Sequence, residues 1–315
     1  MSVSISRRSV ALALGSLGGL GAFGEAMGAR AAGQDQEATA ATSILDAPGR
    51  LTVQVRLNGK GPYAFLVDTG ANASAISSDL ASALDLPLGR PANLHGIAGV
   101  ESVATVVVDS VSVGERERRG LSMSVLPSHY LRAPGVLGMD WLGAQGLTLD
   151  FAERQMHVGA RVPRADQASI SVPVRAQRSG LSLIDARIGS GRAYTFLDTG
   201  STTTVGNPAL MQLALAQGQL TPDWTDIELV SLTGQTMVGR LASLKHLALG
   251  KMLMRSVPVV FGPVHTFEYW GLANAPALLI GVDVLTAFES VTLDFHRGAV
   301  HFRLPGSAPR TTAAS

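Results

Sequence analysis

The chain of 315 residues contains no cysteine. This absence excludes disulfide bonds, a thiolate nucleophile, a zinc site with cysteine ligands and a lipid anchor on cysteine. Charged residues are also few, at 16%, and nearly balanced, with a formal net charge of +1. A charge this small gives no electrostatic basis for binding nucleic acid or an anionic membrane surface. Partners of those two kinds are therefore not expected.

Motifs of several enzyme classes are missing as well. The seven histidines include no His-Glu-x-x-His pattern, and neither Gly-x-Ser-x-Gly nor a phosphate-binding loop occurs. His296 and His301 are five residues apart on an expected hairpin, where a structural role is favoured over metal binding. We therefore expect no metal and no cofactor.

The first residues have the pattern of an export signal rather than of a folded domain. Arg7 and Arg8 open a weakly apolar, glycine-rich stretch that runs to Phe23, and small residues follow at Ala29-Arg30-Ala31. Such a pattern is typical of secretory signals, and the paired arginines resemble a twin-arginine signal. We predict this signal over residues 1–31 of a bacterial protein. An uncleaved membrane anchor is the alternative, which the short, glycine-rich stretch disfavours.

This signal implies a protein exported to the periplasm or the outside, with no stable membrane insertion after signal removal. Residues 32–45 are rich in Ala, Gln, Thr and Glu and are expected to form a flexible lead-in. The remaining chain has abundant glycine and apolar residues, 35 glycines in all and 46% apolar. That composition favours many short strands and turns around a sizeable core.

The same order of signals occurs twice after the lead-in, which indicates an internal duplication. In each half an alternating apolar strand, a glycine turn and a second apolar strand lead into Asp68-Thr69-Gly70 or Asp198-Thr199-Gly200. A helix is expected after each motif, over about Asp79–Leu86 with a cap at Ser77 or Ser78, and from Pro208 to Gly218 with a cap at Asn207. A glycine-containing hairpin, a long strand and an apolar-apolar-Gly element follow in both halves.

The spacing of the repeated elements sets the domain boundaries. The two aspartates are 130 residues apart, and the hairpin glycines Gly99 and Gly234 are 135 apart. A slowly growing offset is what duplicated domains with small loop insertions give. We predict an N-terminal lobe over 46–160, a linker over 161–169, a C-terminal lobe over 170–304 and a loose tail over 305–315.

Two matched aspartates at the ends of apolar strands predict a carboxylate pair. A buried strand holds each carboxylate in place, and Gly70 and Gly200 let the backbone turn and bring amide groups close. Thr69 and Thr199 are placed to hydrogen-bond the facing lobe. Pseudo-twofold pairing then brings the two aspartates within hydrogen-bond reach, where they share a proton. Such a pair can activate a water between its carboxyl groups and protonate a carbonyl oxygen.

These motifs resemble the retropepsin-like and pepsin-like aspartic peptidase superfamily over about residues 50–304. The elements Val136-Leu137-Gly138 and Leu279-Ile280-Gly281 strengthen the resemblance. It implies a mostly β protein with two homologous closed β-barrel-like lobes, the acid protease fold, related by a pseudo-twofold axis. A short helix follows each catalytic loop and a peptide cleft lies between the lobes.

The resemblance also implies residue roles. It makes Asp68 and Asp198 catalytic, with their loops supported by Thr69, Gly70, Thr199, Gly200 and Ser201. The flaps over the peptide would contain Ile97, Ala98, Gly99, Thr233 and Gly234. The segments 127–134 and 263–276 resemble loops that line specificity pockets in the family. Their aromatic residues could either line a pocket or belong to the core; they are Tyr130, Phe267, Tyr269 and Trp270.

Three features depart from the family pattern or remain open. The first flap, residues 94–101, has no tyrosine, so its backbone amides would have to hold water and substrate. Ala71 supplies no hydroxyl beside Asp68, whereas Ser201 has one, and we hypothesise that Asp198 is the more readily ionised partner. The matched Asp140 and Asp283 are expected to cap short helices rather than to take part in catalysis.

The resulting prediction is a monomeric aspartic endopeptidase that hydrolyses peptide bonds in polypeptide substrates. Two alternatives use the same fold, a catalytically silent peptide-binding protein and a processing protease with a single target. Intact aspartates in both lobes argue against the silent form, because a binder has no need for a desolvated like-charge pair.

Overall fold

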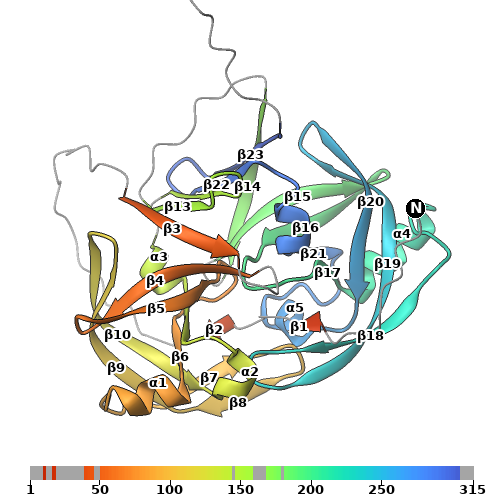
Figure 1. Cartoon of the computed structure of the whole chain (residues 1–315). Coiled ribbons are helices and arrows are strands. Elements are labelled where there is room, and N and C mark those ends of the chain that lie inside the picture. The colour runs from red at the N-terminus through yellow and green to blue at the C-terminus, as the bar shows by residue number, and fades with distance from the viewer. Residues whose placement is uncertain are drawn as a thin grey trace, which may run out of the picture.

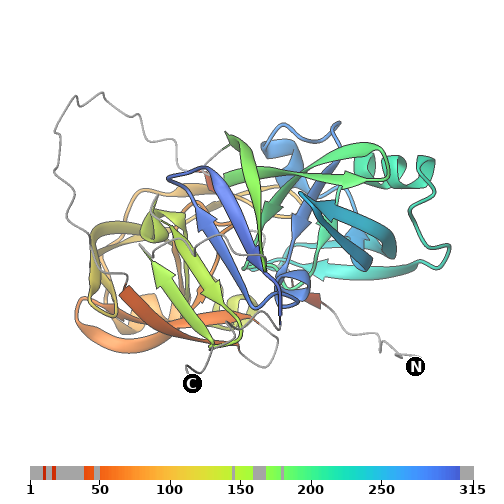
Figure 2. The same cartoon turned by 90° about the horizontal axis from the view of Figure 1, so that it is seen from above.

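The computed structural model describes the parts of the chain that contain both repeats, namely residues 10–11, 16–18, 39–45, 50–143, 146–158, 168–178 and 181–305. The expected signal lies outside these residues except for the backbone of two short strands, as do most of the linker and of the tail. The fold is mostly β, with two closed six-stranded barrels, so the predicted fold class is confirmed. Figures 1 and 2 show the two lobes side by side, joined by a sheet.

The first lobe follows the predicted order of elements. Apolar alternation in β4 turns its apolar side chains inward, since Val53, Val55 and Leu57 are buried while Gln54 and Arg56 are exposed. The elements are β4 (Leu51–Leu57), β5 (Lys60–Val67), β6 (Ala75–Ser77), α1 (Ser78–Ala83), β7 (Ala92–His95), β8 (Val100–Val103), β9 (Thr105–Val113), β10 (Arg116–Leu126), α2 (Ser128–Leu131), β11 (Gly135–Leu137) and α3 (Met139–Leu142).

The second lobe repeats this order with longer hairpin strands. Its elements are β15 (Leu181–Ile188), β16 (Gly191–Leu197), β17 (Val205–Gly206), α4 (Pro208–Ala216), β18 (Thr225–Val230), β19 (Thr236–Leu249), β20 (Met252–Phe261), α5 (His265–Tyr269), β21 (Ala277–Ile280) and α6 (Val282–Leu285). Matching elements occupy matching places in both lobes, which is the tertiary form of the sequence repeat.

The helix caps predicted from the sequence are present. The Ser77 side chain accepts a hydrogen bond from Leu80 N, and α1 ends three residues earlier than expected because Leu84 is already its C-cap and Asp85 has φ +50°. The Asn207 side chain accepts from Leu210 N, and Pro208 begins α4. Gly218, with φ +61°, follows the end of α4 as predicted.

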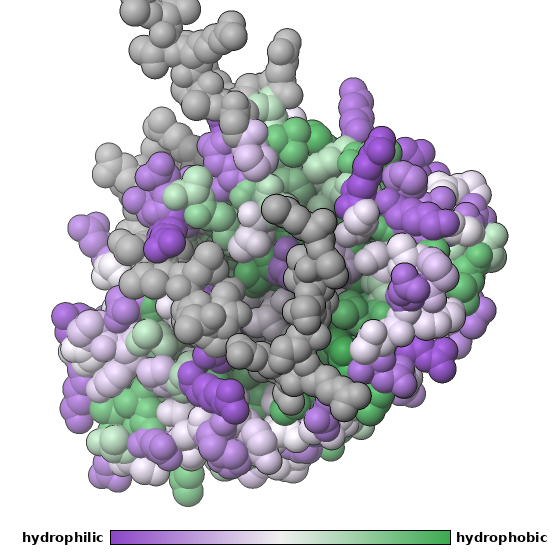
Figure 3. Space-filling view, turned by 45° about the vertical axis from the view of Figure 1, so that its right-hand side comes forward, coloured by the Kyte–Doolittle hydropathy of each residue, from purple (hydrophilic) through white to green (hydrophobic). Residues whose placement is uncertain are grey.

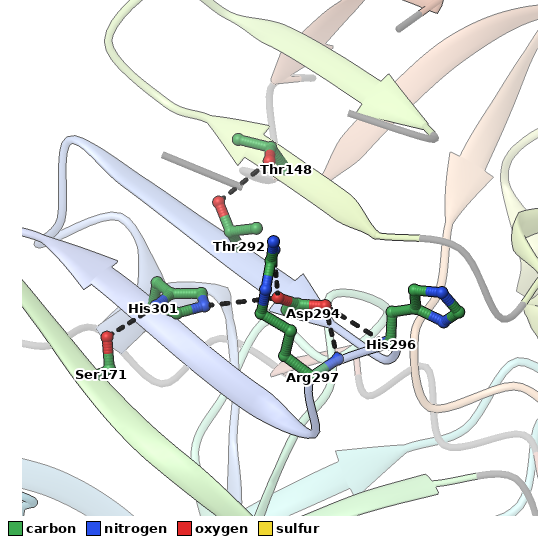
Figure 4. Close-up of polar contacts among 7 residues, drawn as sticks. All are labelled: Thr148, Ser171, Thr292, Asp294, His296, Arg297 and His301. Atoms are coloured by element: carbon green, nitrogen blue, oxygen red, sulfur yellow. Dashed lines mark hydrogen bonds and ion pairs between the residues drawn. The ribbon is translucent and has the colours of Figure 1, made fainter. Parts of the chain in front are cut away.

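A six-stranded antiparallel sheet joins the lobes. Its order is β3 (Thr39–Leu45), β13 (Gln155–Val158), β12 (Leu147–Asp150), β22 (Ser290–Asp294), β23 (Ala299–Arg303) and β14 (Ser169–Arg178). The near-identical strands β12 and β22 pair at its centre, where the hydroxyls of Thr148 and Thr292 are 2.9 Å apart (Figure 4). This cross-strand pair marks the pseudo-twofold axis.

Asp294 organises the second-lobe side of this sheet. Its carboxylate is buried and accepts hydrogen bonds from the backbone of His296 and Arg297 and from the Arg297 side chain (Figure 4). His301 Nε2 lies 3.8 Å from Asp294 Oδ2, while Nδ1 of the same ring is 2.7 Å from Ser171 Oγ across the β14–β23 pair. The His301 ring therefore takes part in the polar contacts of the joining sheet, and His296 does so through its backbone N–H.

Two expectations about the ends of the lobes change with the structure. Thr39–Leu45, inside the expected flexible lead-in, forms β3 and pairs with both β13 and β4, because the joining sheet offers it two backbone partners. Ser169, the last residue of the expected linker, begins β14. No helix among the described residues has the length and apolar character needed to cross a membrane.

Candidate active site

The two Asp-Thr-Gly motifs lie directly after β5 and β16, and both aspartates are buried. Asp68 Oδ1 accepts hydrogen bonds from Gly70 N at 2.8 Å and from Ala71 N at 2.9 Å. Asp198 Oδ1 accepts them from Gly200 N at 2.8 Å and from Ser201 N at 3.2 Å. The turn after each strand therefore fixes one carboxylate oxygen with two amides, as the glycine positions predicted.

The second oxygen of each carboxylate points to the other lobe. Asp68 and Asp198 lie close enough for a hydrogen bond between their side chains, and the Oδ2 atoms have no other partner among the described residues. A Cβ atom on Gly70 would lie 2.6 Å from Asp198 Cγ, and one on Gly200 would overlap the Asp68 carboxyl group. Each carboxyl group thus packs on the glycine of the opposite motif, where a side chain has no room.

The two threonines lock the loops together, as the sequence predicted. Thr69 Oγ1 donates to Leu197 O at 2.9 Å and accepts from Thr199 N at 3.2 Å. Thr199 Oγ1 donates to Val67 O at 2.7 Å and accepts from Thr69 N at 3.1 Å. All four bonds are buried and cross between the lobes, so they fix the distance between the aspartates.

The apolar-apolar-Gly strands support each loop from below. β11 pairs in parallel with the end of β5, and Leu137 O accepts a hydrogen bond from Asp68 N at 3.1 Å. A Cβ atom on Gly138 would lie 2.6 Å from the backbone carbon of Ala73, so only glycine fits. β21 and β16 repeat the arrangement in the second lobe, where Ile280 O accepts from Asp198 N at 2.9 Å.

Asp140 and Asp283 lie in the first turns of α3 and α6, where each carboxylate accepts a hydrogen bond from the next backbone N–H, and both also anchor these glycines. The N-cap residues of α3 and α6 are Gly138 and Gly281. Ser74 Oγ donates to Asp140 Oδ1 at 2.6 Å and accepts from Gly138 N at 3.0 Å. In the second lobe Thr204 Oγ1 donates to Asp283 Oδ1 at 2.7 Å and accepts from Gly281 N at 3.1 Å.

The sequence showed the two aspartates but not the hydroxyls that connect them to the glycines. Ser74 and Thr204 lie 130 residues apart, the offset that also separates Asp68 from Asp198. Matching hydroxyl residues at that offset is the signal that could have revealed them.

Burial and mutual repulsion make the pair hard to ionise fully. Burial raises the pKa of Asp68 to about 6, although hydrogen bonds from Asp198, Gly70 and Ala71 oppose the rise. Burial, followed by the Asp68 charge, raises the pKa of Asp198 well above its ordinary value. One proton therefore stays on the pair at neutral pH while the other carboxyl group is ionised.

The hypothesis that Ser201 favours ionisation of Asp198 is wrong. The Ser201 hydroxyl donates to Thr203 O at 2.6 Å and accepts from Thr203 N at 3.3 Å, so its single proton is not available to the carboxylate. Burial raises the pKa of both carboxyl groups and the Asp68 charge raises that of Asp198 further, so we assign the negative charge of the pair to Asp68. Ser201 still supports the catalytic loop, through its backbone N–H.

The predicted flap residues lie in two hairpins. The first flap comprises β7, the turn and β8 (residues 92–103), and the second comprises β18, its turn and the start of β19 (residues 225–241). Gly99 and Gly234 have φ of +152° and +86°, which residues other than glycine rarely adopt. The structure places Ile97, Ala98, Thr233 and both glycines at these two turns.

Each flap tip inserts into the opposite lobe. Ile97 is fully buried in a cluster whose other members all belong to the second lobe, among them Phe196, Phe267 and Leu272. Leu232 is buried in a cluster of first-lobe residues that includes Ala71 beside the aspartate. Sequence analysis missed Leu232, although it lies 135 residues after Ile97, the same offset as the hairpin glycines.

The two flap turns also touch each other. Gln235 Oε1 accepts a hydrogen bond from Ala98 N at 3.2 Å, and its Nε2 donates to Glu101 Oε1 at 2.9 Å. Gly96 lies against the same side chain, so that a Cβ atom there would overlap Gln235 Oε1. The amide of Ala98, expected to face substrate, is therefore occupied by the second flap in this closed arrangement.

The aromatic residues of the pocket-like segments divide into core and wall. Phe267 and Trp270 are buried and pack with Phe196, with the Phe196 and Trp270 ring centroids 4.4 Å apart, so they are core. Tyr130 is 40% exposed and lies under Gly234 of the second flap, while the Tyr269 ring lies 3.9 Å from His95 of the first. The two tyrosines thus face the flaps at the surface, while Phe267 and Trp270 belong to the core cluster that receives Ile97 of the first flap.

On the face shown in Figure 3, hydrophilic residues cover much of the surface and hydrophobic residues gather in several patches. Within the part of the chain that the structure describes, His, Asp and Glu side chains form no group of three or more that could hold a metal ion. The local chemistry is that of two carboxyl groups, backbone amides and hydroxyls.

The comparisons with known proteins agree with this geometry. Residues 53–141 match a family model described as aspartyl protease, a segment that contains Asp68, the first flap and Gly138. No curated protein matches the chain. The second lobe repeats the matched elements in the same order and with the same contacts. The match makes the first lobe similar to aspartyl proteases and supports a retropepsin-like aspartic peptidase family for it.

Proposed function

We propose that this protein is an aspartic endopeptidase in which Asp68 and Asp198 activate one water molecule to hydrolyse peptide bonds. The family match over residues 53–141 supports a protease function. The observation on which the proposal rests is the facing pair of buried carboxyl groups, each with one oxygen fixed by amides and one turned to the other lobe.

The chemistry follows from the protonation of the pair. The ionised Asp68 accepts a proton from a water held between the carboxyl groups, and the water oxygen bonds to the carbonyl carbon. The protonated Asp198 donates to the carbonyl oxygen, giving a neutral tetrahedral diol. A proton then passes from the pair to the amide nitrogen, the C–N bond breaks, and an acid and an amine leave. As the C–N bond breaks, one hydroxyl of the diol gives its proton to the pair, which again holds a single proton.

The flap edges support an extended polypeptide as the substrate. Residues 10–11 of the chain itself form β1 (Val10–Ala11) and pair in parallel with β18, and residues 16–18 form β2 (Ser16–Gly18) and pair antiparallel with β7. Both flaps therefore have strand edges that can add an extended backbone, whose N–H and C=O groups give affinity independent of sequence.

Two further properties are part of the proposal. Because one chain supplies both aspartates, a monomer is sufficient for activity. The sequence pattern at residues 1–31 makes the protein an exported one, which acts in the periplasm or outside the cell.

The decisive experiment is cleavage of a denatured protein between pH 4 and pH 8. We expect cleavage that pepstatin inhibits and that Asp68→Asn abolishes, while Asp109→Asn, at an exposed aspartate of β9 outside both flaps, leaves it unchanged. Mapping the cut sites in a peptide library distinguishes a general endopeptidase from a protease with one target. Absence of cleavage at every pH, or cleavage that persists in Asp68→Asn, would favour the silent peptide-binding protein instead.

A further inference from the structure

The first flap has a contact with the second lobe that involves two histidines. His95 Nδ1, at the end of β7, lies 3.2 Å from His265 Nε2, the first residue of α5. The two rings are stacked with centroids 5.4 Å apart and an angle of 6° between their planes. The contact lies beside the buried Ile97, whose carbonyl oxygen accepts a hydrogen bond from His265 N at 2.8 Å.

Among the described residues, two elements contribute further titratable groups beside the pair. On α5, Glu268 Oε2 lies 3.4 Å from His265 Nδ1, and the Tyr269 ring packs on His95. On β8, which pairs with β7, Glu101 carries the carboxylate that binds Gln235 of the second flap. Among these, Glu268 is positioned to hold a proton on His265 Nδ1.

Counting protons shows which states of the pair allow the contact. With His265 neutral and its Nδ1 proton facing Glu268, His95 Nδ1–H donates to His265 Nε2. With one added proton on His265, Nε2–H donates to the lone pair of His95 Nδ1. With two added protons, both nitrogens carry hydrogen and no lone pair remains between them. The contact is then lost and two positive charges face each other.

We propose that His95 and His265 form a proton-operated latch that holds the first flap closed and releases it when both rings are protonated. The latch controls access to the aspartate pair, so its biological use rests on the proposed function, while the structural event does not. Burial and the neighbouring His265 lower the pKa of His95, as expected for a second proton that the closed contact resists.

The second flap provides an internal comparison. Its tip residue Leu232 packs with Leu131 of α2, and Gly234 of the same turn lies against the Tyr130 ring. The position that matches His95 is Val230. A proton-operated latch therefore acts on one flap only. Acid should open the first flap and leave the second one closed.

The expected shift follows from linkage. If only the open flap binds the second proton with the ordinary histidine pKa, the ratio of open to closed molecules rises about tenfold for each pH unit below about 6.5. Between pH 7.5 and pH 4.5 the ratio should therefore rise by up to about a hundredfold.

The test measures flap position directly, by double electron–electron resonance on spin-labelled full-length protein. Since the chain has no cysteine, introduced cysteines are the only labelling sites. Ala98→Cys with Leu253→Cys reports the first flap against the second lobe, and Val238→Cys with Leu88→Cys reports the second flap against the first lobe; all four positions are exposed. A longer distance at pH 4.5 than at pH 7.5 is expected for the first pair alone.

Three substitutions assign the effect to the latch. His95→Gln keeps a hydrogen-bonding side chain that cannot become charged, so its first flap should stay closed at pH 4.5. His265→Gln should behave in the same way and serves if the first variant does not fold. His129→Gln, on the matching helix α2, should open in acid like the unaltered protein.

Several results would overturn the proposal. Unchanged distances between the two pH values, equal opening of both flaps, or normal acid opening in His95→Gln would each do so. Acid opening that disappears in Glu101→Gln but not in His95→Gln would assign the switch to the contact between the flaps. Because the readout is a distance, it remains interpretable whether or not the protein cleaves peptides.

Discussion

Replacing Asp68 with asparagine removes a charge from the carboxyl pair while keeping the shape of the side chain. The asparagine Oδ1 can still accept the hydrogen bonds from Gly70 N and Ala71 N, and its amide can donate to Asp198. We expect this variant to lose peptide cleavage and, at neutral pH, to be more stable than the unaltered protein.

The magnitude follows from the pKa of Asp68. In the folded protein it is raised from 3.8 to about 6, and each unit of difference corresponds to about 1.4 kcal/mol. The raised value means that the folded state holds the proton more tightly than the unfolded chain does. The destabilisation is thus absent below about pH 4, grows between pH 4 and pH 6, and reaches about 3 kcal/mol above that range.

The assay is denaturant unfolding of both proteins at pH 3.5, 5 and 7. Asp68→Asn should gain about 3 kcal/mol in the free energy of unfolding at pH 7, about 6–12 °C in melting temperature, and nothing at pH 3.5. Asp226→Asn, at a 74% exposed side chain, is the matched control and should change neither value. A stability gain of equal size at all three pH values, or a loss at pH 7, would show that ionisation of the Asp68 carboxyl group does not destabilise the folded protein.

The remaining predictions concern catalysis and the frame of the site. Values of kcat/KM should fall toward tenfold per pH unit below about pH 6, because Asp68 must be ionised; full activity at pH 4 would contradict this. Thr199→Val removes two buried hydrogen bonds between the lobes and should lower the free energy of unfolding by about 2–4 kcal/mol, against about 1 kcal/mol for Thr148→Val. Equal losses in denaturant unfolding would mean that the loops are not locked as described. Asp283→Ala leaves the Thr204 donors unsatisfied and should cost about 1–3 kcal/mol, whereas Asp283→Asn should recover most of it; a neutral alanine variant would argue against that anchor.

Local patterns identified the site because its geometry is built from short segments. An apolar strand that ends in Asp-Thr-Gly fixes one carboxylate oxygen with amides two and three residues away, as seen at Asp68 and Asp198. Helix caps at Ser77 and Asn207 are equally local, since the side chain bonds an amide three residues on. Interactions of such short range depend little on the rest of the fold.

Other parts of the site needed partners distant in the sequence. The Ser201 hydroxyl had two acceptors within reach, and only the path of the turn decided that it bonds Thr203 O and not Asp198. Thr39–Leu45 continues a stretch rich in Ala, Gln, Thr and Glu, and it forms a strand because two neighbouring strands, β13 and β4, supply hydrogen bonds. Neither outcome is contained in the local composition.

What the sequence by itself determined is the duplication and the two aspartates. A repeated order of strands, turns and motifs forces two similar lobes, and glycine at positions 70, 138, 200 and 281 anticipates close backbone approach. Only the tertiary structure decided which lobe each flap covers. It buries Ile97 in the second lobe and Leu232 in the first, and it brings His95 into contact with His265. The physical reason is that buried contacts form between residues that are close in space. How the two lobes face each other depends on the shapes of the folded lobes, and no single segment of the sequence carries that information.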